Sequence, residues 1–277
     1  MKAAPVWAFL FLFVGLVATG AQDRSKSKQD WFDVPLKKTT VDFGPSFDKP
    51  SDTSPAWQWS AYRRARNTLT CYWFPSLMVK EYDISQKGAD WISLTRIQPN
   101  ARPECTLSHV PGERVFAQGD EWFGYFSGVK GNFVFLGAAD GTDGGIRFAV
   151  YDSRTGKKLF EDADCLMCMH LKKNGQAPLS APFNRMRISR ALSGAITLKY
   201  MRVEQANCDL RTDKASCWDH VKKQMDVKGG KSPVCLDSAR TPVGELPSMV
   251  AHPVFVSLES PPVVRSINGP VLCWAPD

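Results

Sequence analysis

The side chains with the widest chemical scope lie in one short segment, Cys165-Leu166-Met167-Cys168-Met169-His170. Two cysteines three residues apart can form a redox couple near a helix N-terminus, because the positive end of the helix dipole favours the thiolate. Acidic residues just before this pair favour the neutral thiol instead, and no thioredoxin-like alternation of strand and helix surrounds it. The segment therefore predicts structural disulfide cysteines, with a redox site as the alternative.

Metal binding is the other chemistry that this segment could support. Thiolate, thioether and imidazole groups suit Cu(I) or Zn(II), and the candidate ligands are Cys165, Cys168, Met169 and His170. No second paired cluster completes a four-ligand site in the sequence. Covalent haem attachment requires a histidine directly after the second cysteine, where this chain has Met169. The sequence therefore predicts no metal and no other cofactor.

The cysteine count predicts a disulfide framework. An even number of cysteines in an exported chain indicates bridges, because an oxidising compartment joins neighbouring thiols. Eight cysteines permit 105 full pairings, so connectivity depends on local spacing. Spacing favours a bridge across the short loop 208–217, a second around 71–105 and a third between 235 and 273, which leaves the pair at 165 and 168. The disulfide candidates are Cys71, Cys105, Cys165, Cys168, Cys208, Cys217, Cys235 and Cys273.

Familiar catalytic motifs are absent from the chain. It contains no G-x-S-x-G elbow, no H-E-x-x-H pair and no phosphate-binding glycine loop. The four histidines are separated from one another in sequence, and dispersed carboxylates give no pairing. Trp57 and Trp59 could stack on sugars, although core packing is the favoured interpretation. We therefore assign no catalytic residue, and the sequence favours a non-enzymatic protein over an enzyme.

The N-terminus has the order of a secretory signal peptide. Lys2 supplies a positive start, an apolar run extends from Val6 to Val17, and Thr19 and Ala21 provide the small residues of a cleavage site. We expect residues 1–21 to be removed. The apolar run is shorter than the roughly 20 residues that a bilayer-spanning helix needs, so no transmembrane anchor is expected after cleavage. The protein is expected to be periplasmic or secreted.

The charge pattern gives little information about partners. The formal net charge is +7, and basic residues cluster at 63–66 and 186–190. Acidic residues are distributed throughout the chain, and no nucleic-acid-binding motif accompanies the basic clusters. We therefore expect no nucleic-acid partner and leave other partners unassigned.

The remaining chain has the pattern of a mainly β protein. Residues 22–56 are polar and proline-containing, which indicates a flexible N-terminal arm or, alternatively, an extended segment that wraps over the domain. Residues 57–277 are expected to form a disulfide-stabilised β-rich domain, an antiparallel meander or sandwich with minor helix, or alternatively a propeller-like fold. Short apolar runs bounded by turn residues predict strands. The expected strands are 69–74, 91–95, 122–126, 132–136, 146–151, 158–160, 186–189, 195–203 and 253–258, with a helix at 217–225.

Several motifs resemble a group of uncharacterised exported proteins of Gram-negative bacteria. The similar segments include Gly124-Tyr125-Phe126-Ser127-Gly128-Val129-Lys130-Gly131, Phe148-Ala149-Val150-Tyr151-Asp152 and residues 155–162. Cys217-Trp218, the stretch from Pro247 to Val254 and Gly269 to Trp274 continue the similarity towards the C-terminus. The resemblance implies an exported bacterial protein. No activity is established for that group, so it supplies no catalytic residue.

These observations leave two hypotheses about function. The first is an exported non-catalytic protein that binds a ligand or associates with the cell envelope. The alternative is a redox or metal-binding protein that uses the Cys165, Cys168 and His170 segment.

Overall fold

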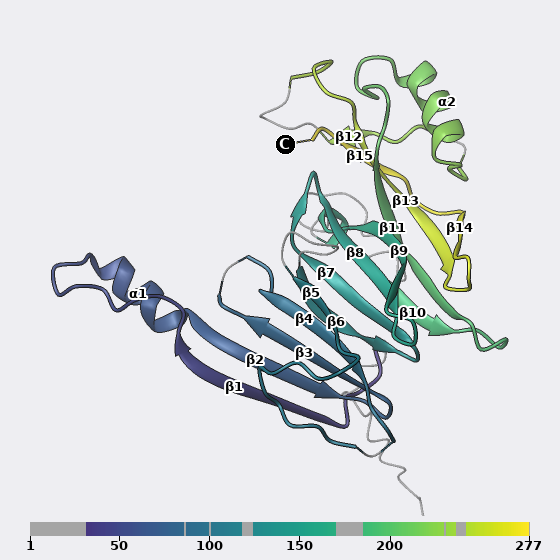
Figure 1. The fold of residues 1–277 in the computed structure, drawn as a ribbon. Helices are drawn as coiled ribbons and strands as arrows, with labels where there is room; N and C mark the ends of the chain where they lie inside the picture. Colours follow the sequence, from purple (N-terminus) through teal and green to yellow (C-terminus); the bar gives the residue numbers. More distant parts are fainter. Residues whose placement is uncertain are drawn as a thin grey trace, which may run out of the picture.

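The computed structural model describes residues 32–85, 87–99, 101–117, 124–169, 185–229, 231–236 and 242–276. The expected signal peptide, residues 1–21, lies outside the described residues, as does His170. The described residues form two β-sheets and two short α-helices (Figure 1).

The first sheet is an antiparallel meander in which five strands follow one another in chain order. A short helix, α1 (Ala56–Arg64), separates the first two strands in sequence. Figure 1 shows α1 and the loop before it extending away from the end of this sheet. The strands are β1 (Lys37–Pro45), β2 (Arg66–Trp73), β3 (Leu77–Asp83), β4 (Trp91–Arg96) and β5 (Arg114–Ala117).

The second sheet has ten strands and a main order of β12-β15-β13-β11-β9-β8-β7-β6. β10 adds to β11 and β14 adds to β13, and only the short β12–β15 pair is parallel. Helix α2 (Lys214–Gln224) follows β11. The strands are β6 (Gly124–Lys130), β7 (Phe133–Thr142), β8 (Gly145–Asp152), β9 (Lys157–Cys165), β10 (Arg187–Arg190), β11 (Ile196–Gln205), β12 (Cys235–Leu236), β13 (Met249–Ser257), β14 (Val263–Ser266) and β15 (Leu272–Trp274).

Turn chemistry explains the β7–β8 hairpin. Thr142 pairs with Gly145, so Asp143 and Gly144 are its two loop residues. Both have positive φ, at 49° and 81°, as a type I′ turn requires, and Asp-Gly is a preferred sequence for it. The Trp274 indole packs on this turn and donates a 3.0 Å hydrogen bond to the Asp143 carbonyl. A local sequence signal thus also anchors the C-terminus.

Strands β7 and β8 have apolar cores on both faces. On one face, Val134 and Leu136 pack with Val79 and Leu94 of the first sheet. On the other face, β7 and β8 contribute to a second core with residues of β10, β11, β13 and β14. Strands β9 and β11 share a single registered pair, so the second sheet can bend between them. The strands beyond β11 then pack over the outer face of β7 and β8. The result is a layered β-structure with a two-sided centre.

The expected fold class is confirmed. The described residues are mainly β, the sheets are antiparallel apart from one short pair, and they do not form a propeller. The expected meander is present as β6 to β9, although residues 122 and 123 lie outside the described range. The expected helix at 217–225 corresponds to α2, which begins three residues earlier, where the Asp213 side chain accepts a hydrogen bond from the Ser216 amide.

The structure corrects the expectation of a flexible arm for part of residues 22–56. Residues 37–45 form β1, which pairs with β2 from Lys37 opposite Trp73 to Pro45 opposite Arg66. A sequence boundary at residue 57 would therefore divide one sheet. The arm composition is polar because β1 is an edge strand with many exposed side chains, and lysine, proline and a bulge are common at such edges.

We predict that proline will be costly within β1. Adjacent backbone N–H groups point to opposite sides of a strand, so one of Thr39 and Thr40 must donate towards β2. Thr39→Pro and Thr40→Pro should therefore differ, and the worse variant should lose at least about 1 kcal/mol of unfolding free energy, the net contribution of the ladder hydrogen bond that proline removes. Denaturant unfolding measures this loss.

Asp52→Pro provides the control. Asp52 follows Ser51 in a turn closed by a 2.9 Å hydrogen bond from the Ser54 amide to the Ser51 carbonyl, a position where proline is favoured. This control should unfold like the wild type. If both threonine variants also did so, β1 would not contribute to the sheet.

Candidate functional site

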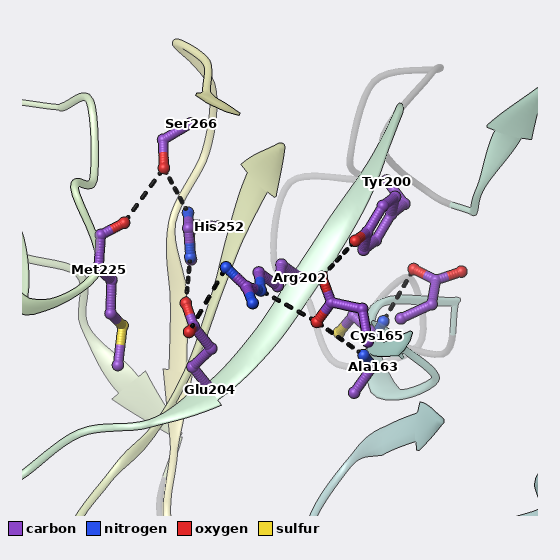
Figure 2. A network of polar contacts seen from close by, with 10 residues as sticks. Ala163, Cys165, Tyr200, Arg202, Glu204, Met225, His252 and Ser266 are labelled. Atoms are coloured by element: carbon purple, nitrogen blue, oxygen red, sulfur yellow. Dashed lines mark hydrogen bonds and ion pairs between the residues drawn. The ribbon is translucent and has the colours of Figure 1, made fainter. Parts of the chain in front are cut away.

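A polar network joins β9, β11, β13 and β14 of the second sheet (Figure 2). The Tyr200 hydroxyl donates to Asp162, and Arg202 Nε donates to the same carboxylate at 2.9 Å. Arg202 also lies 3.6 Å from Glu204, which contacts His252 Nε2 at 2.9 Å. The chain of contacts therefore runs from β9 through β11 to β13.

Strand register places these side chains. Residues 200, 202 and 204 alternate along β11, so their side chains share one face. Arg202 lies opposite His252 on β13 and opposite Asp164 on β9. Because β9 and β11 share only this one registered pair, their backbone hydrogen-bond ladder does not continue along the strands. The Asp164 carboxylate serves as an acceptor there: it accepts from the Cys165 amide at 2.8 Å and from the Met186 amide at 3.3 Å. The network thus occupies the place where the sheet changes direction.

Burial dominates the electrostatics of the two β9 carboxylates. Burial raises the pKa of Asp162, and the Tyr200 hydrogen bond and the Arg202 charge limit that rise. Burial raises the pKa of Asp164 to about 6, because its two backbone donors compensate less. Burial and the neighbouring Asp162 also raise the pKa of Tyr200 well above its usual range, which keeps it protonated. The cluster therefore holds one proton-sensitive carboxylate near neutral pH.

Glu204, His252 and Ser266 contact one another in the acid–histidine–serine order of a hydrolytic triad. Their burial and their other hydrogen bonds give them a structural role instead. Burial alone would raise the pKa of Glu204, yet the His252 hydrogen bond and Arg202 bring it below its usual value. Ser266 Oγ lies 3.4 Å from His252 Nδ1 and donates at 3.1 Å to the Met225 carbonyl. The His252 side chain is only 1% exposed, so a substrate cannot reach it. These groups connect β11, β13 and β14 to the end of α2.

A second buried charge cluster fastens the loop that covers the outer face of the first sheet. Lys80 Nζ lies 3.2 Å from Glu113 and donates at 2.8 Å to the Ser108 carbonyl. Ser93 donates to the same glutamate, which also accepts from the Val110 amide at 2.8 Å. Burial opposes ionisation of Glu113, but these donors together lower its pKa below the usual value. Because Lys80 and Glu113 find partners inside the protein, in Ser93 and in the backbone of residues 108 and 110, this cluster holds the loop onto the sheet.

The cysteines form four disulfides in the pattern that spacing favoured. The bridges are Cys71–Cys105, Cys165–Cys168, Cys208–Cys217 and Cys235–Cys273. The described residues include no free cysteine.

The C-x-x-C segment is placed in the interior. Cys165 and Cys168 are 2% and 3% exposed and pack with Met201 and Trp274. Redox exchange requires access to a sulfur atom, which this packing denies.

The metal candidates are only partly described. His170 lies outside the described residues, and so does the side chain of Met169. Within the described parts of the chain, no three His, Cys, Asp or Glu residues gather as a group that could hold a metal ion. Cys165 and Cys168 bond to each other and thereby lose their thiolate ligand function.

Among the described residues, the most exposed aromatic side chains lie on α1 and in the loop before it. Trp57 is 67% exposed, so the interpretation of this residue as core packing is wrong, while Trp59 is half-buried. Trp57 borders an open hollow of about 340 Å³ on the side of α1. The hollow is lined by Phe47, Asp48, Pro50, Trp57, Gln58, Ala61 and Tyr62.

Comparisons with known proteins add no assignment. No family model matches this chain, no curated protein matches its sequence, and no solved structure matches its fold. No described helix combines the length and apolar character needed to cross a bilayer.

We predict a pH-dependent effect of Asp164→Asn. Because the folded-state pKa of Asp164 is raised to about 6, the native state binds a proton more tightly than the unfolded chain does. The stabilisation by this proton is complete below the unfolded-state pKa of about 3.9 and is lost as pH rises through about 6. The melting temperature of the variant minus that of the wild type should therefore be larger at pH 7.5 than at pH 4.

Asp219→Asn is the matched control. Asp219 is exposed, and its hydrogen bond with Lys222 lowers its pKa. The stabilisation by its carboxylate is therefore lost as pH falls, so the melting temperature of Asp219→Asn relative to wild type should not rise with pH. Thermal unfolding at both pH values compares the variants. A constant difference between Asp164→Asn and wild type would contradict the assignment.

Proposed function

We propose that this protein is an exported, non-catalytic binding protein that associates with the cell envelope. The observation that carries the proposal is a contrast in exposure: the groups that could do chemistry are buried, whereas aromatic side chains at α1 are exposed. The reactive-looking groups, including the C-x-x-C pair and His252, are buried. The exposed apolar groups, by contrast, include Trp57 and Phe47 beside an open hollow.

Four disulfides support an exported location. They are typical of oxidising compartments, where bridges stabilise a chain against unfolding. The signal-like sequence of residues 1–21 and the resemblance to exported Gram-negative proteins favour the periplasm or the cell exterior. Binding in such a location requires a durable scaffold, and the bridges fasten both the loop over the first sheet and the C-terminal strand β15.

Buried clusters argue against catalysis as the primary role. A catalytic acid, base or nucleophile must reach its substrate, whereas Lys80 and Glu113 satisfy each other inside the protein. Non-catalytic recognition instead uses exposed aromatic side chains, which supply large contact areas.

Thiol accessibility tests the proposal against the redox or metal-binding alternative. Protein purified without reductant should show no reactive thiol when native and when denatured. Mild dithiothreitol should leave Cys165–Cys168 intact in the native state, because both residues are buried. Mass spectrometry after alkylation identifies any reduced pair, and metal analysis accompanies it. Selective native reduction of this pair, or one equivalent of tightly bound metal, would overturn the proposal.

Cell fractionation tests envelope association. The protein should occur in the periplasmic or extracellular fraction, lack residues 1–21 by mass spectrometry, and be partly recovered with envelopes. A version lacking residues 2–21 should remain in the cytoplasm and provides the control for association after lysis. Equal recovery of both versions with envelopes would show that the association arises after lysis.

A further inference from the structure

Strands β10, β11, β13 and β14 of the second sheet have an outer face that carries basic side chains. On the opposite, inner face, Leu198 and Val256 pack in one core with Phe135 of β7. Because side chains alternate between the two faces of a strand, the neighbouring Lys199 and Phe255 point away from that core. Figure 1 shows these strands on the side of the molecule away from the first sheet. Lys199 is exposed, so this outer face is open to solvent.

Strand register aligns four side chains on this face. Lys199 of β11 lies opposite Arg187 of β10 on one side and opposite Phe255 of β13 on the other. Phe255 in turn lies opposite Arg265 of β14. Residues directly opposite each other share one face of a sheet. With neighbouring strands about 4.8 Å apart, the four side chains form a line about 14 Å long. We call this line the basic row, and its members are Arg187, Lys199, Phe255 and Arg265.

The positions that flank the basic row carry no acidic side chain. On one side, Thr197 lies between Ser189 and Ser257, which gives a line of hydroxyl groups. On the other side, Met201 lies opposite Pro253. The surface around the cations is therefore neutral, with hydroxyl groups along one side.

The cations of the basic row are exposed and have no ionic partner in the part of the chain that the structure describes. Lys199 Nζ lies 5.9 Å from the centre of the Phe255 ring. Arg187 and Lys199 lie directly opposite each other, and like charges in that position destabilise a sheet. Glu259 lies in the turn after β13, beyond the line of hydroxyl groups. An anion bound along the row would therefore relieve a repulsion that the fold itself leaves.

The linear arrangement of the basic row favours a linear polyanion. Cations placed along one direction can bind successive charges of one chain, whereas a membrane presents its charges in a plane. Phe255 is only partly exposed, so it cannot insert into a bilayer as the aromatic side chains of interfacial helices do. Its ring can instead stack against another flat ring.

A polysaccharide made of uronic acids has the chemistry that this surface requires. Each sugar carries one carboxylate, and a pyranose ring is about as long as the distance between neighbouring strands. Four consecutive sugars can therefore place carboxylates over the cations and one ring over Phe255. Arginine binds carboxylates through paired hydrogen bonds. The hydroxyl groups of Ser189 and Ser257 can donate to sugar hydroxyls or accept from them.

We propose that the basic row binds a linear polyuronate, with about four sugars lying across β10, β11, β13 and β14. The row is separate from the aromatic hollow at α1. The choice of a polysaccharide over a nucleic acid rests on the exported location in the proposed function, which the four disulfides support. Binding should be salt-dependent, because exposed ion pairs are screened.

Isothermal titration calorimetry with alginate oligosaccharides tests the proposal. Affinity should rise from the disaccharide to the tetrasaccharide and then level off, because the row is about as long as four sugars. Added sodium chloride should weaken tetrasaccharide binding. Neutral dextran oligosaccharides should not bind, since they carry no carboxylate.

Removal of the three positive charges identifies the surface. Arg187→Gln/Lys199→Gln/Arg265→Gln should weaken tetrasaccharide binding at least about tenfold, because three exposed ion pairs are lost. Phe255→Leu keeps an apolar side chain but removes the aromatic face. It should weaken binding without changing the salt dependence, since stacking involves no ion pair.

A matched control removes the same charge elsewhere. Lys157→Gln/Lys214→Gln/Lys231→Gln alters three exposed positions outside the row and should leave the affinity unchanged. Both triple variants should unfold at the wild-type temperature, because all of the altered side chains are exposed, and circular dichroism measures this.

Three results would contradict the polyuronate site. The first is a wild-type protein that does not bind the tetrasaccharide up to about 1 mM, the range of very weak complexes. The second is an equal affinity of the two triple variants. The third is binding of phosphatidylglycerol vesicles or single-stranded DNA through the row without binding of alginate, which would assign the row to a membrane or a nucleic acid. These measurements use purified protein, so their failure is distinguishable from failure of the thiol and fractionation tests.

Discussion

The two-sided burial of β7 and β8 is the constraint on which the rest of the structure depends. Leu136 faces the first sheet, while Phe135, the next residue back, faces β11 and β13. Because alternate side chains point to opposite faces, an apolar run in these strands requires a covering layer on each side. The first sheet provides one layer. The second sheet provides the other by turning where β9 and β11 share a single registered pair.

That change of direction explains why the polar network lies where it does. A ladder that breaks inside a protein leaves backbone donors that need acceptors. The Asp164 carboxylate is such an acceptor, and it binds the Cys165 amide. The nearby Asp162 carboxylate accepts a hydrogen bond from Tyr200 and forms an ion pair with Arg202. The shift of the Asp164 pKa to about 6 is therefore a consequence of architecture. A perturbed pKa in a cluster like this one marks a structural junction as readily as a catalytic site.

The sequence reveals local features of this fold and conceals the distant ones. The Asp143-Gly144 turn, the β6 to β9 meander and the Cys208–Cys217 bridge follow from residues that are close in the chain. The contact between Glu204 and His252 spans 48 residues, and no local pattern in the sequence indicates which histidine meets which carboxylate. Strand β1 escaped prediction for another reason. An edge strand needs no continuous apolar pattern, so its composition resembles that of a loop.

The exposure of Trp57 is another feature that the sequence does not reveal. Aromatic residues usually enter a core, and a sequence offers no sign of which one will not. Here the sheet packing leaves no interior position for α1, because β1 and β2 pair up to Pro45 and Arg66 and the helix begins beyond that point. A tryptophan kept outside by topology retains its capacity to bury area, which is about 150–250 Å² for a large aromatic side chain.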